Sequence, residues 1–394
     1  MPLKDSLAPL NMAKIYKPRR EPLFKFGGTL MKITGMEAIT VNVQYIETVR
    51  KYRPEGRQSL ILKIHTDEGI VGLGEAYAGR EDEERLKGYA KGLLGRDPME
   101  LNLADLWSFM PGIPSYAFLG FEMALYDILG KKLGLPVCKL LGGRFRDWVP
   151  LAYWSHEMTV EETVSEALVA VEKGFKVYKF KAWERNYKGS VVERVKAIDK
   201  AVGDGLALRL EANWAWENPA RAMGIIRKLE GYNIECLEDP VPYNLEWYRL
   251  LRRKTSLPIA IHFENGSSYP RPREILNALK AEACDYMNIA GPDFHEGFLK
   301  GAAIADMAGV RIWHGGHLAF AIMDAAFAHA CGAVKNDLLP CDLLHHLFED
   351  DLILKPLKFK DGFLEVPKGP GLGIELDDEA VKRHEIRRVE VKAD

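Results

Sequence analysis

Five short apolar segments decide the fold of this 394-residue chain: VYKFK (177–181), ALRLE (207–211), IECLE (234–238), IAIHF (259–263) and YMNI (286–289). Each has the length and composition of a buried strand, and stretches with apolar residues at helical spacing lie between them. The strand ends fall near positions 181, 211, 238, 264, 289 and 314, in steps of 30, 27, 26, 25 and 25 residues. A nearly constant strand-plus-helix period favours parallel βα units.

Three further strands complete a set of eight. Residues 310–314 continue the series, residues 149–154 form a short apolar segment before it, and residues 338–341 form a weaker one after it. Eight βα units over about 200 residues predict a (β/α)8 barrel. A doubly wound open sheet is the alternative, and the absence of a Gly-x-Gly-x-x-Gly sequence after the first strand favours the barrel.

The part of the chain before the barrel has a different pattern. Residues 33–43 and 59–65 read as strands, a turn at 67–69 leads into a third, and residues 118–133 form an amphipathic helix that stops at Gly134. We predict an irregular, proline-bearing arm over 1–30, an α+β capping domain over 31–145, and the barrel over 146–350. The remaining segment, 351–394, is expected to pack back on the capping domain.

Composition excludes several classes of protein. The 54 basic and 56 acidic residues give a net charge of −2, which provides no electrostatic attraction for nucleic acid or an anionic membrane. No apolar run reaches the roughly 18 residues of a membrane span, and no secretion pattern opens the chain. Five cysteines without a C-x-x-C pair indicate buried thiols in a reducing, cytoplasmic compartment.

Three successive predicted strands end in a carboxylate: Glu211, Glu238 and Glu264. In a barrel these side chains face the catalytic mouth. Carboxylates that lie this near to one another repel each other and raise each other's pKa. A hard divalent cation, which prefers oxygen ligands, relieves this repulsion. We therefore predict a Mg²⁺ site. The alternative is that each carboxylate forms its own salt bridge or caps the next helix.

The strand before these carboxylates carries two lysines on one face, Lys179 and Lys181. Two neighbouring ammonium groups depress each other's pKa, so one of them is a candidate general base. Lys179 is alternatively a residue that holds a substrate carboxylate or a ligand glutamate. A cation beside a lysine base suits removal of the proton next to a carboxylate.

Several other residues are candidates for the same mouth. His314 ends a predicted strand, His317 follows it, and Asp293 is placed to orient the imidazole of His314. Asn213 and Trp214 lie two and three residues after Glu211 and are candidate cavity residues, although Trp214 is alternatively a residue that packs the loop. His262 and His156 lie near strand ends and are further candidates for lining the cavity.

These residues resemble the enolase superfamily in its mandelate racemase-like branch, from about Met31 to about His384. The resemblance rests on Lys179-x-Lys181, Glu211-x-Asn213, Glu238-Asp239-Pro240, Glu264-Asn265, Ala124-Leu125-Tyr126-Asp127, Leu140-Leu141-Gly142-Gly143 and Gly369-Pro370-Gly371-Leu372-Gly373. It implies a capping domain that closes the barrel mouth and selects the substrate through the loops at 46–57 and 75–80. In the first loop, the candidates for substrate contact are Tyr52, Arg53 and Arg57.

Carried over by position, the resemblance assigns roles to individual residues. Glu211, Glu238 and Glu264 would bind Mg²⁺, Lys181 would be the base with Lys179 assisting, and His314 would act on the other face with an aspartate partner. The chain departs from the family pattern at two places. Glu211 stands where aspartate is usual, and Asp293 comes after Ile289-Ala290-Gly291-Pro292, later than the usual partner of the histidine. No lysine ends the sixth strand, which counts against muconate cycloisomerases and dipeptide epimerases.

The resemblance implies a hydro-lyase that acts on a small carboxylate. We expect an acid-sugar dehydratase, in which a base takes the α-proton and water leaves from the β-carbon. Two alternatives are a racemase or epimerase of a 2-hydroxy or amino acid, and a protein that binds an acid or metal without turnover. A homo-oligomer is also expected.

Overall fold

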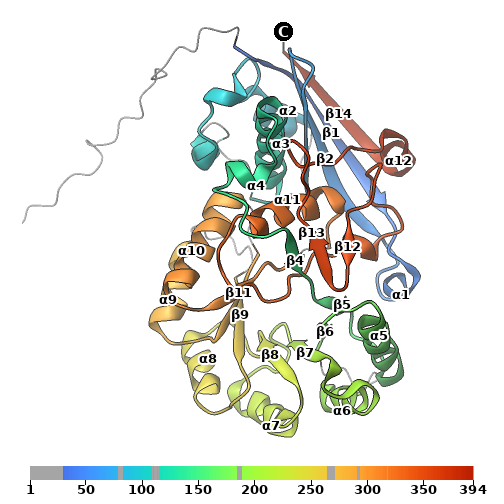
Figure 1. Ribbon diagram of the computed structural model, residues 1–394, viewed down its shortest axis with the longest axis vertical. Coiled ribbons are helices and arrows are strands. Elements are labelled where there is room, and N and C mark those ends of the chain that lie inside the picture. Colours follow the sequence, from blue (N-terminus) through green and yellow to red (C-terminus); the bar gives the residue numbers. More distant parts are fainter. Residues whose placement is uncertain are drawn as a thin grey trace, which may run out of the picture.

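The computed structural model describes residues 30–78, 83–108, 110, 113, 115–183, 189–263, 271–290, 293–316 and 318–393. The predictions that concern the arm before residue 30, Arg80, Glu264 and His317 lie outside these residues. The described part forms a capping sheet with its helices and a barrel beneath it (Figure 1).

The capping domain is a four-stranded antiparallel sheet in the order β14-β1-β2-β3. Its strands are β1 (Ile33–Val43), β2 (Arg57–Thr66), β3 (Val71–Tyr77) and β14 (Glu385–Lys392). Helix α3 (Ser115–Leu133) packs closely on β3, where a Cβ at Gly74 would lie 1.9 Å from the carbonyl oxygen of Gly120. Glycine at this point therefore allows the close approach of helix and sheet. The shorter helices of the domain are α1 (Glu47–Arg50), α2 (Glu83–Lys91), η2 (Pro98–Glu100), η3 (Leu103–Ser108) and α4 (Val137–Leu140).

The barrel contains seven parallel strands in sequence order, from β5 to β11. They are β5 (Tyr153–Ser155), β6 (Val177–Lys181), β7 (Ala207–Glu211), β8 (Ile234–Glu238), β9 (Ile259–Phe263), β10 (Tyr286–Ile289) and β11 (Arg311–Trp313). The segment 338–341 takes the eighth place, because Leu338 bridges Ile312 of β11 and Cys341 bridges Leu151, both in parallel. The predicted barrel is confirmed, and β6 to β10 have the predicted bounds.

One predicted strand is wrong in its extent. Residues 149–154 do not form one strand, because β4 (Trp148–Pro150) pairs with β13 (Phe363–Glu365) in a separate sheet and only β5 joins the barrel. The β4-β13 sheet also contains β12 (Phe359–Lys360). Apolar character alone does not distinguish one strand from two that pair with different partners.

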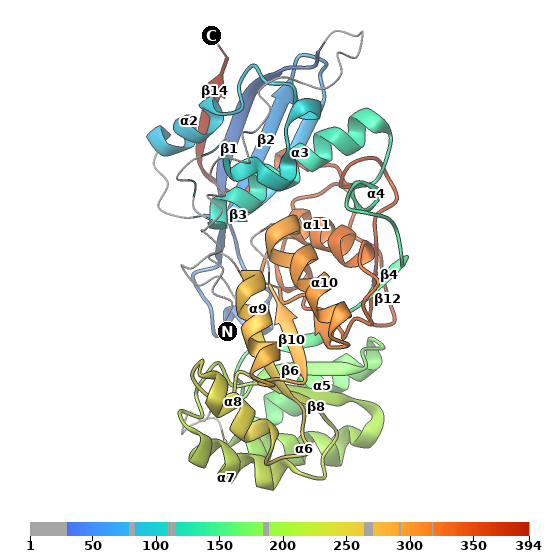
Figure 2. The same cartoon turned by 90° about the vertical axis from the view of Figure 1, so that its left-hand side faces the viewer.

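Helices alternate with the strands and cover the outside of the barrel (Figure 2). They are α5 (Val160–Glu172), α6 (Val191–Val202), α7 (Pro219–Leu229), α8 (Leu245–Arg252), α9 (Arg271–Lys280), η5 (Phe294–Leu299), α10 (Lys300–Met307) and α11 (Ala321–Gly332). Thr159 and Ser190 begin α5 and α6 with capping boxes. In each of these boxes the side chain of the cap residue accepts a hydrogen bond from a backbone N–H of the first turn.

The chain returns to the capping domain at its end. Helix α12 (Asp378–His384) leads into β14, which pairs with β1. The remaining short helices, η4 (Gly203–Gly205) and η6 (His345–Leu347), belong to the barrel. A second link between the two parts is Glu75 of β3, whose carboxylate accepts hydrogen bonds from the backbone of Phe320 and Met323 at the start of α11. None of the described helices has the length and hydropathy needed to cross a membrane.

Candidate active site

A cavity of about 390 Å³ lies between the capping domain and the C-terminal ends of the barrel strands. Arg53, Arg57 and Tyr77 line it from the capping domain. The barrel contributes polar side chains from four strand ends and from the segment after the eighth strand: Lys179, Lys181, Glu211, Asn213, His262, Asn288 and Asp342. Its volume is in the range of small-molecule sites.

Lys179 is buried at the centre of this group. Its Nζ atom lies 2.8 Å from Glu238 Oε2, 2.8 Å from Asp342 Oδ2 and 3.3 Å from Glu211 Oε2. Burial acts to lower the pKa of Lys179, but the three negative charges outweigh it and raise the pKa above its usual value. The sequence predicted a depressed pKa for the lysine pair. For Lys179 that expectation is wrong, because its neighbours are carboxylates as well as Lys181.

Lys181 occupies a more open position on the same face of β6. Its Nζ atom lies 2.7 Å from Glu211 Oε2 and donates to Asn213 Oδ1 at 2.8 Å. Asn213 in turn donates to Glu211 Oε1 at 2.8 Å, which closes a triangle of contacts. Asn213 has a φ of 44°, a left-handed conformation that asparagine adopts more readily than most residues. The Glu211-x-Asn213 sequence therefore turns the amide back onto its own strand end.

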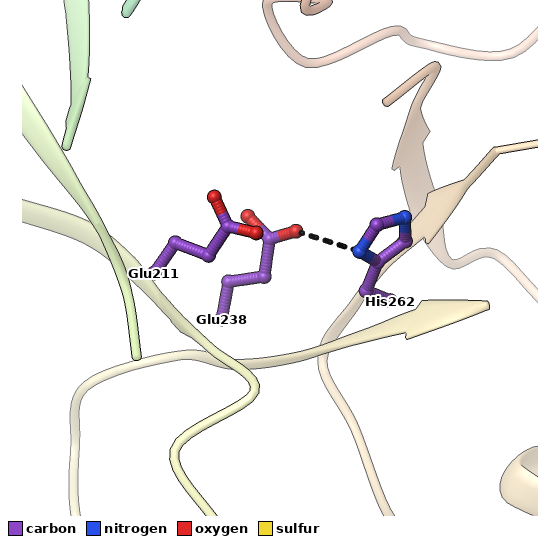
Figure 3. A group of neighbouring side chains, drawn as sticks. All are labelled: Glu211, Glu238 and His262. Carbon is purple, nitrogen blue, oxygen red and sulfur yellow. Dashed lines mark ion pairs between the residues drawn. The ribbon is translucent and has the colours of Figure 1, made fainter. Parts of the chain in front are cut away.

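Glu238 and His262 face each other across the next strand pair (Figure 3). His262 Nδ1 lies 3.7 Å from Glu238 Oε1, the same oxygen that accepts a 2.7 Å hydrogen bond from Asn288 Nδ2. Burial, together with the negative charges of Glu211 and Asp342, raises the pKa of Glu238 to about 7 despite the attraction of Lys179.

One potential ligand atom from each of Glu211, Glu238 and His262 lies within 4.8 Å of the others. Two carboxylate oxygens and an imidazole nitrogen fit a divalent cation, so this group is a candidate metal site. The predicted third carboxylate, Glu264, lies two residues beyond His262 and outside the described residues. Its role as a ligand stays a prediction.

The structure does not bring His314 and Asp293 together. His314 is buried between Phe298 and Phe327, with ring centroids 5.2 and 3.7 Å away, and burial lowers its pKa to about 3. Neither ring nitrogen has a hydrogen-bond partner among the described residues, and His314 is not among the described residues that line the cavity. Asp293 instead accepts a hydrogen bond from the backbone of Gly297 and caps η5.

The residues predicted to contact the substrate divide into two groups. Arg53, Arg57 and Asn213 line the cavity. Tyr52 points elsewhere, because its hydroxyl donates to Glu162 of α5 and its ring stacks on His156. Trp214 is 50% exposed and is not among the described residues that line the cavity.

Among the polar residues that line the cavity, the sequence missed Asn288 and Asp342, and it covered Tyr77 only as part of the loop 75–80. Asp342 directly follows the segment 338–341, so the same rule that identified Glu211 applies to it once that weak strand is accepted. Asn288 lies one residue before the end of β10, and Tyr77 ends β3 in the capping domain. No sequence signal distinguished Asn288 from an ordinary strand residue, and only the resemblance, through the loop 75–80, pointed to the region of Tyr77.

Comparison with known proteins agrees with this architecture. Residues 162–380 match the family model described as "Enolase C-terminal domain-like", and residues 43–142 match "Mandelate racemase / muconate lactonizing enzyme, N-terminal domain". The solved structure of N-succinyl Arg/Lys racemase from Bacillus cereus superposes with a TM-score of 0.81 at 26% identity, over 92% of this chain and 100% of that one.

Three curated relatives carry different activities. N-succinyl-L-Arg/Lys racemase of Bacillus cereus is 30% identical over 82% of this chain and 89% of its own length. Muconate cycloisomerase 1-1 of Acinetobacter lwoffii is 31% identical, with 90% and 97% covered. D-xylonate dehydratase of Haloferax volcanii is 29% identical, with 82% and 85% covered.

A capped barrel with lysines and carboxylates converging on a candidate cation site defines an enzyme that acts on carbon acids. The chain belongs to the mandelate racemase/muconate lactonizing enzyme family of the enolase superfamily. Its class of reaction is metal-dependent abstraction of the proton α to a carboxylate, and its substrate is a small carboxylate.

Proposed function

We propose that this enzyme is a Mg²⁺-dependent acid-sugar dehydratase. The observation that carries the proposal is the position of Lys181, whose amine lines a polar cavity 2.7 Å from the candidate metal ligand Glu211. The neighbouring cavity residues Asn213, Asn288 and Tyr77 offer hydrogen-bonding groups to the hydroxyls of a sugar acid. D-xylonate dehydratase, a relative of comparable identity, acts on a substrate of this kind.

Each residue has a role in the proposed reaction. Glu211 and Glu238, with Glu264 or His262, would hold the cation, which would supply positive charge beside the anion that forms when the α-proton leaves. The neutral amine of Lys181 takes that proton, and Lys179 stays protonated among its three carboxylates and holds the substrate carboxylate in place. The C–O bond to the β-carbon then breaks, and the ammonium of Lys181 returns a proton to the departing hydroxyl, which leaves as water.

This one-base elimination places both proton transfers on one face of the substrate. The sequence resemblance assigned His314 to the opposite face, but its buried position between two phenylalanines does not support that role. Asp293 caps η5 and does not orient His314. A lyase that uses Lys181 for both transfers needs neither residue.

The second candidate is a racemase or epimerase. It is favoured by the 30% identity to N-succinyl-L-Arg/Lys racemase, and it begins with the same proton abstraction. A racemase returns the proton to the other face, which needs a second acid–base group opposite Lys181. The cycloisomerase relatives suggest a third reaction, cycloisomerisation. The sixth barrel strand counts against it, because this strand ends at Ile289 without a lysine.

Product analysis in deuterated water separates these reactions. The enzyme, with Mg²⁺, is incubated with a panel of sugar acids and of N-acyl amino acids and followed by NMR. A dehydratase forms a 2-keto-3-deoxy acid from at least one sugar acid. Exchange and inversion of the α-position without any keto product, on any member of the panel, would replace the dehydratase with the racemase.

A further inference from the structure

Two arginines of the capping domain line the cavity and have no carboxylate partner among the residues that the structure describes. Arg53 follows α1, and Arg57 is the first residue of β2. Both line the cavity, and no ion pair joins either of them to a carboxylate in the described part of the chain. The Nε atom of each is buried and has no hydrogen-bond acceptor. The guanidinium of Arg57 instead lies over the ring of Tyr77, 4.8 Å from its centroid.

The other two cations of the same loop behave differently. Arg50 pairs with Glu349, and Lys51 pairs with Glu162, so each is neutralised by a carboxylate of the barrel side. These two pairs anchor the loop 46–57 at the barrel rim. The anchored loop directs Arg53 and Arg57 inward, where no carboxylate of the described residues forms an ion pair with them.

The charges on the barrel side do not balance the two arginines. With Lys181 as the neutral base of the proposed reaction, Lys179 supplies one positive charge there against the three negative charges of Glu211, Glu238 and Asp342. A divalent cation at Glu211 and Glu238 would bring these described charges to zero, so a ligand with two negative charges would balance the two arginines. Unpaired charges in a partly buried cavity are costly, so the counter-ion for the arginines is expected to arrive with the ligand.

We propose that the substrate carries a second carboxylate, at the end opposite the reacting carbon, and that Arg53 and Arg57 bind it. The substrate class is then a sugar diacid. Guanidinium groups present paired N–H donors that match a carboxylate, which makes two arginines a specific subsite for such an end. This inference rests on the proposed function, because it names the substrate of that same site.

Binding to an inert variant tests the inference without requiring turnover. The Lys181→Met variant is loaded with Mg²⁺ and titrated calorimetrically with pairs of acids that differ only at the far end. The pairs are galactarate and galactonate, glucarate and gluconate, and xylarate and xylonate. For at least one pair, the diacid is expected to bind at least about tenfold more tightly than its monoacid.

Substitution of the arginines then locates the effect. Arg53→Gln and Arg57→Gln in the same background should each weaken diacid binding by about tenfold and change monoacid binding by less than about twofold. Arg53→Lys keeps the charge and should lose less than Arg53→Gln. Arg221→Gln, which removes an exposed arginine paired with Glu217, is the control and should change neither affinity. Thermal unfolding of each variant checks that it is folded.

Three results would overturn the inference. They are equal or tighter binding of the monoacid in every pair, equal losses for both acids on arginine substitution, and failure of every acid to bind. Failure of the proposed dehydration is distinguishable from failure of this inference. Arginine-dependent binding of a diacid can be observed even if the wild-type enzyme forms no keto acid.

Discussion

The Nζ atom of Lys179 lies 2.8 Å from Oδ2 of Asp342, which joins the second barrel strand to the end of the segment that closes the barrel. The same carboxylate oxygen accepts a 3.3 Å hydrogen bond from the indole of Trp313. Asp342 is thereby one of three carboxylates that hold the ammonium of Lys179, together with Glu211 and Glu238. Its contact links the placement of the lysine to the segment that closes the barrel.

We expect Asp342→Asn to lower kcat by about 100-fold with little change in KM, because small displacements of positioning groups slow the reacting step. The free energy of unfolding should fall by about 3 kcal/mol, since a buried ion pair loses one partner. Kinetics and urea unfolding measure the two effects. Asp337→Asn, which removes an exposed partner of Arg311, should change neither, and an unchanged kcat in Asp342→Asn would refute the positioning role.

The imidazole of His262 in the candidate metal site leads to a prediction about which metal ion the protein prefers. An imidazole ligand favours Mn²⁺ over Mg²⁺, so the wild-type protein should bind Mn²⁺ more tightly, and His262→Gln should lose about tenfold in Mn²⁺ affinity. The electron paramagnetic resonance signal of free Mn²⁺ gives the affinity directly. His65→Gln, in the capping sheet beside Glu37, is the control. Unaltered Mn²⁺ affinity in His262→Gln would mean that His262 is not a ligand and that carboxylates alone bind the cation.

Glu162 holds the loop 46–57 against helix α5. It accepts from Lys51, from the Tyr52 hydroxyl and from the backbone of Thr159, and although burial opposes them, these bonds hold its pKa at about 2. Glu162→Gln should loosen the loop and raise KM several-fold while kcat stays within about twofold, since uniform binding is lost. The neighbouring, exposed Glu161→Gln is the matched control. Equal KM values in the two variants would contradict the anchoring role.

Glu75 makes the stability of the protein depend on pH. Burial raises its pKa to about 7, above its usual value, although the backbone of Phe320 and Met323 donates to it. A carboxyl whose pKa is raised in the folded state stabilises it most at low pH, and that contribution is lost as pH rises towards about 7. Between pH 5 and 8, wild-type stability should fall by about 2 kcal/mol relative to Glu75→Gln.

Urea unfolding at the two pH values measures this difference. The exposed Glu390→Gln, on strand β14 of the same sheet, should follow the wild-type protein at both pH values. A constant gap between wild type and Glu75→Gln would mean that the carboxyl is ionised throughout this range.

Much of the fold could be predicted because parallel barrel strands are buried on both faces. Continuous apolar segments marked β6 to β10, and the period between them indicated the barrel. The same signal failed at residues 149–154, because an apolar stretch does not show that its two halves pair with different strands. The weak strand at 338–341 was also difficult to recognise, since it joins its neighbours only by isolated bridges.

The site was predicted where a residue type and a strand end coincide, as at Lys179, Lys181, Glu211 and Glu238. His314 also ends a strand, but two phenylalanines from η5 and α11 surround it, and such neighbours are set by packing between distant segments. The pKa of Lys179 was misjudged for the same reason, because Asp342 approaches it from 163 residues away. The domain boundaries, the cytoplasmic location and the homo-oligomer stay predictions.

Exchange of the α-proton of a bound acid with deuterated water tests the central claim most directly. NMR follows this exchange, in the presence of Mg²⁺, for wild type, Lys181→Met and Lys176→Met, the last removing an exposed lysine just before the same strand. Wild type and Lys176→Met should exchange the proton, and Lys181→Met should exchange it at least about 1,000-fold more slowly while still binding the acid. Exchange at the wild-type rate in Lys181→Met would contradict the assignment of the base.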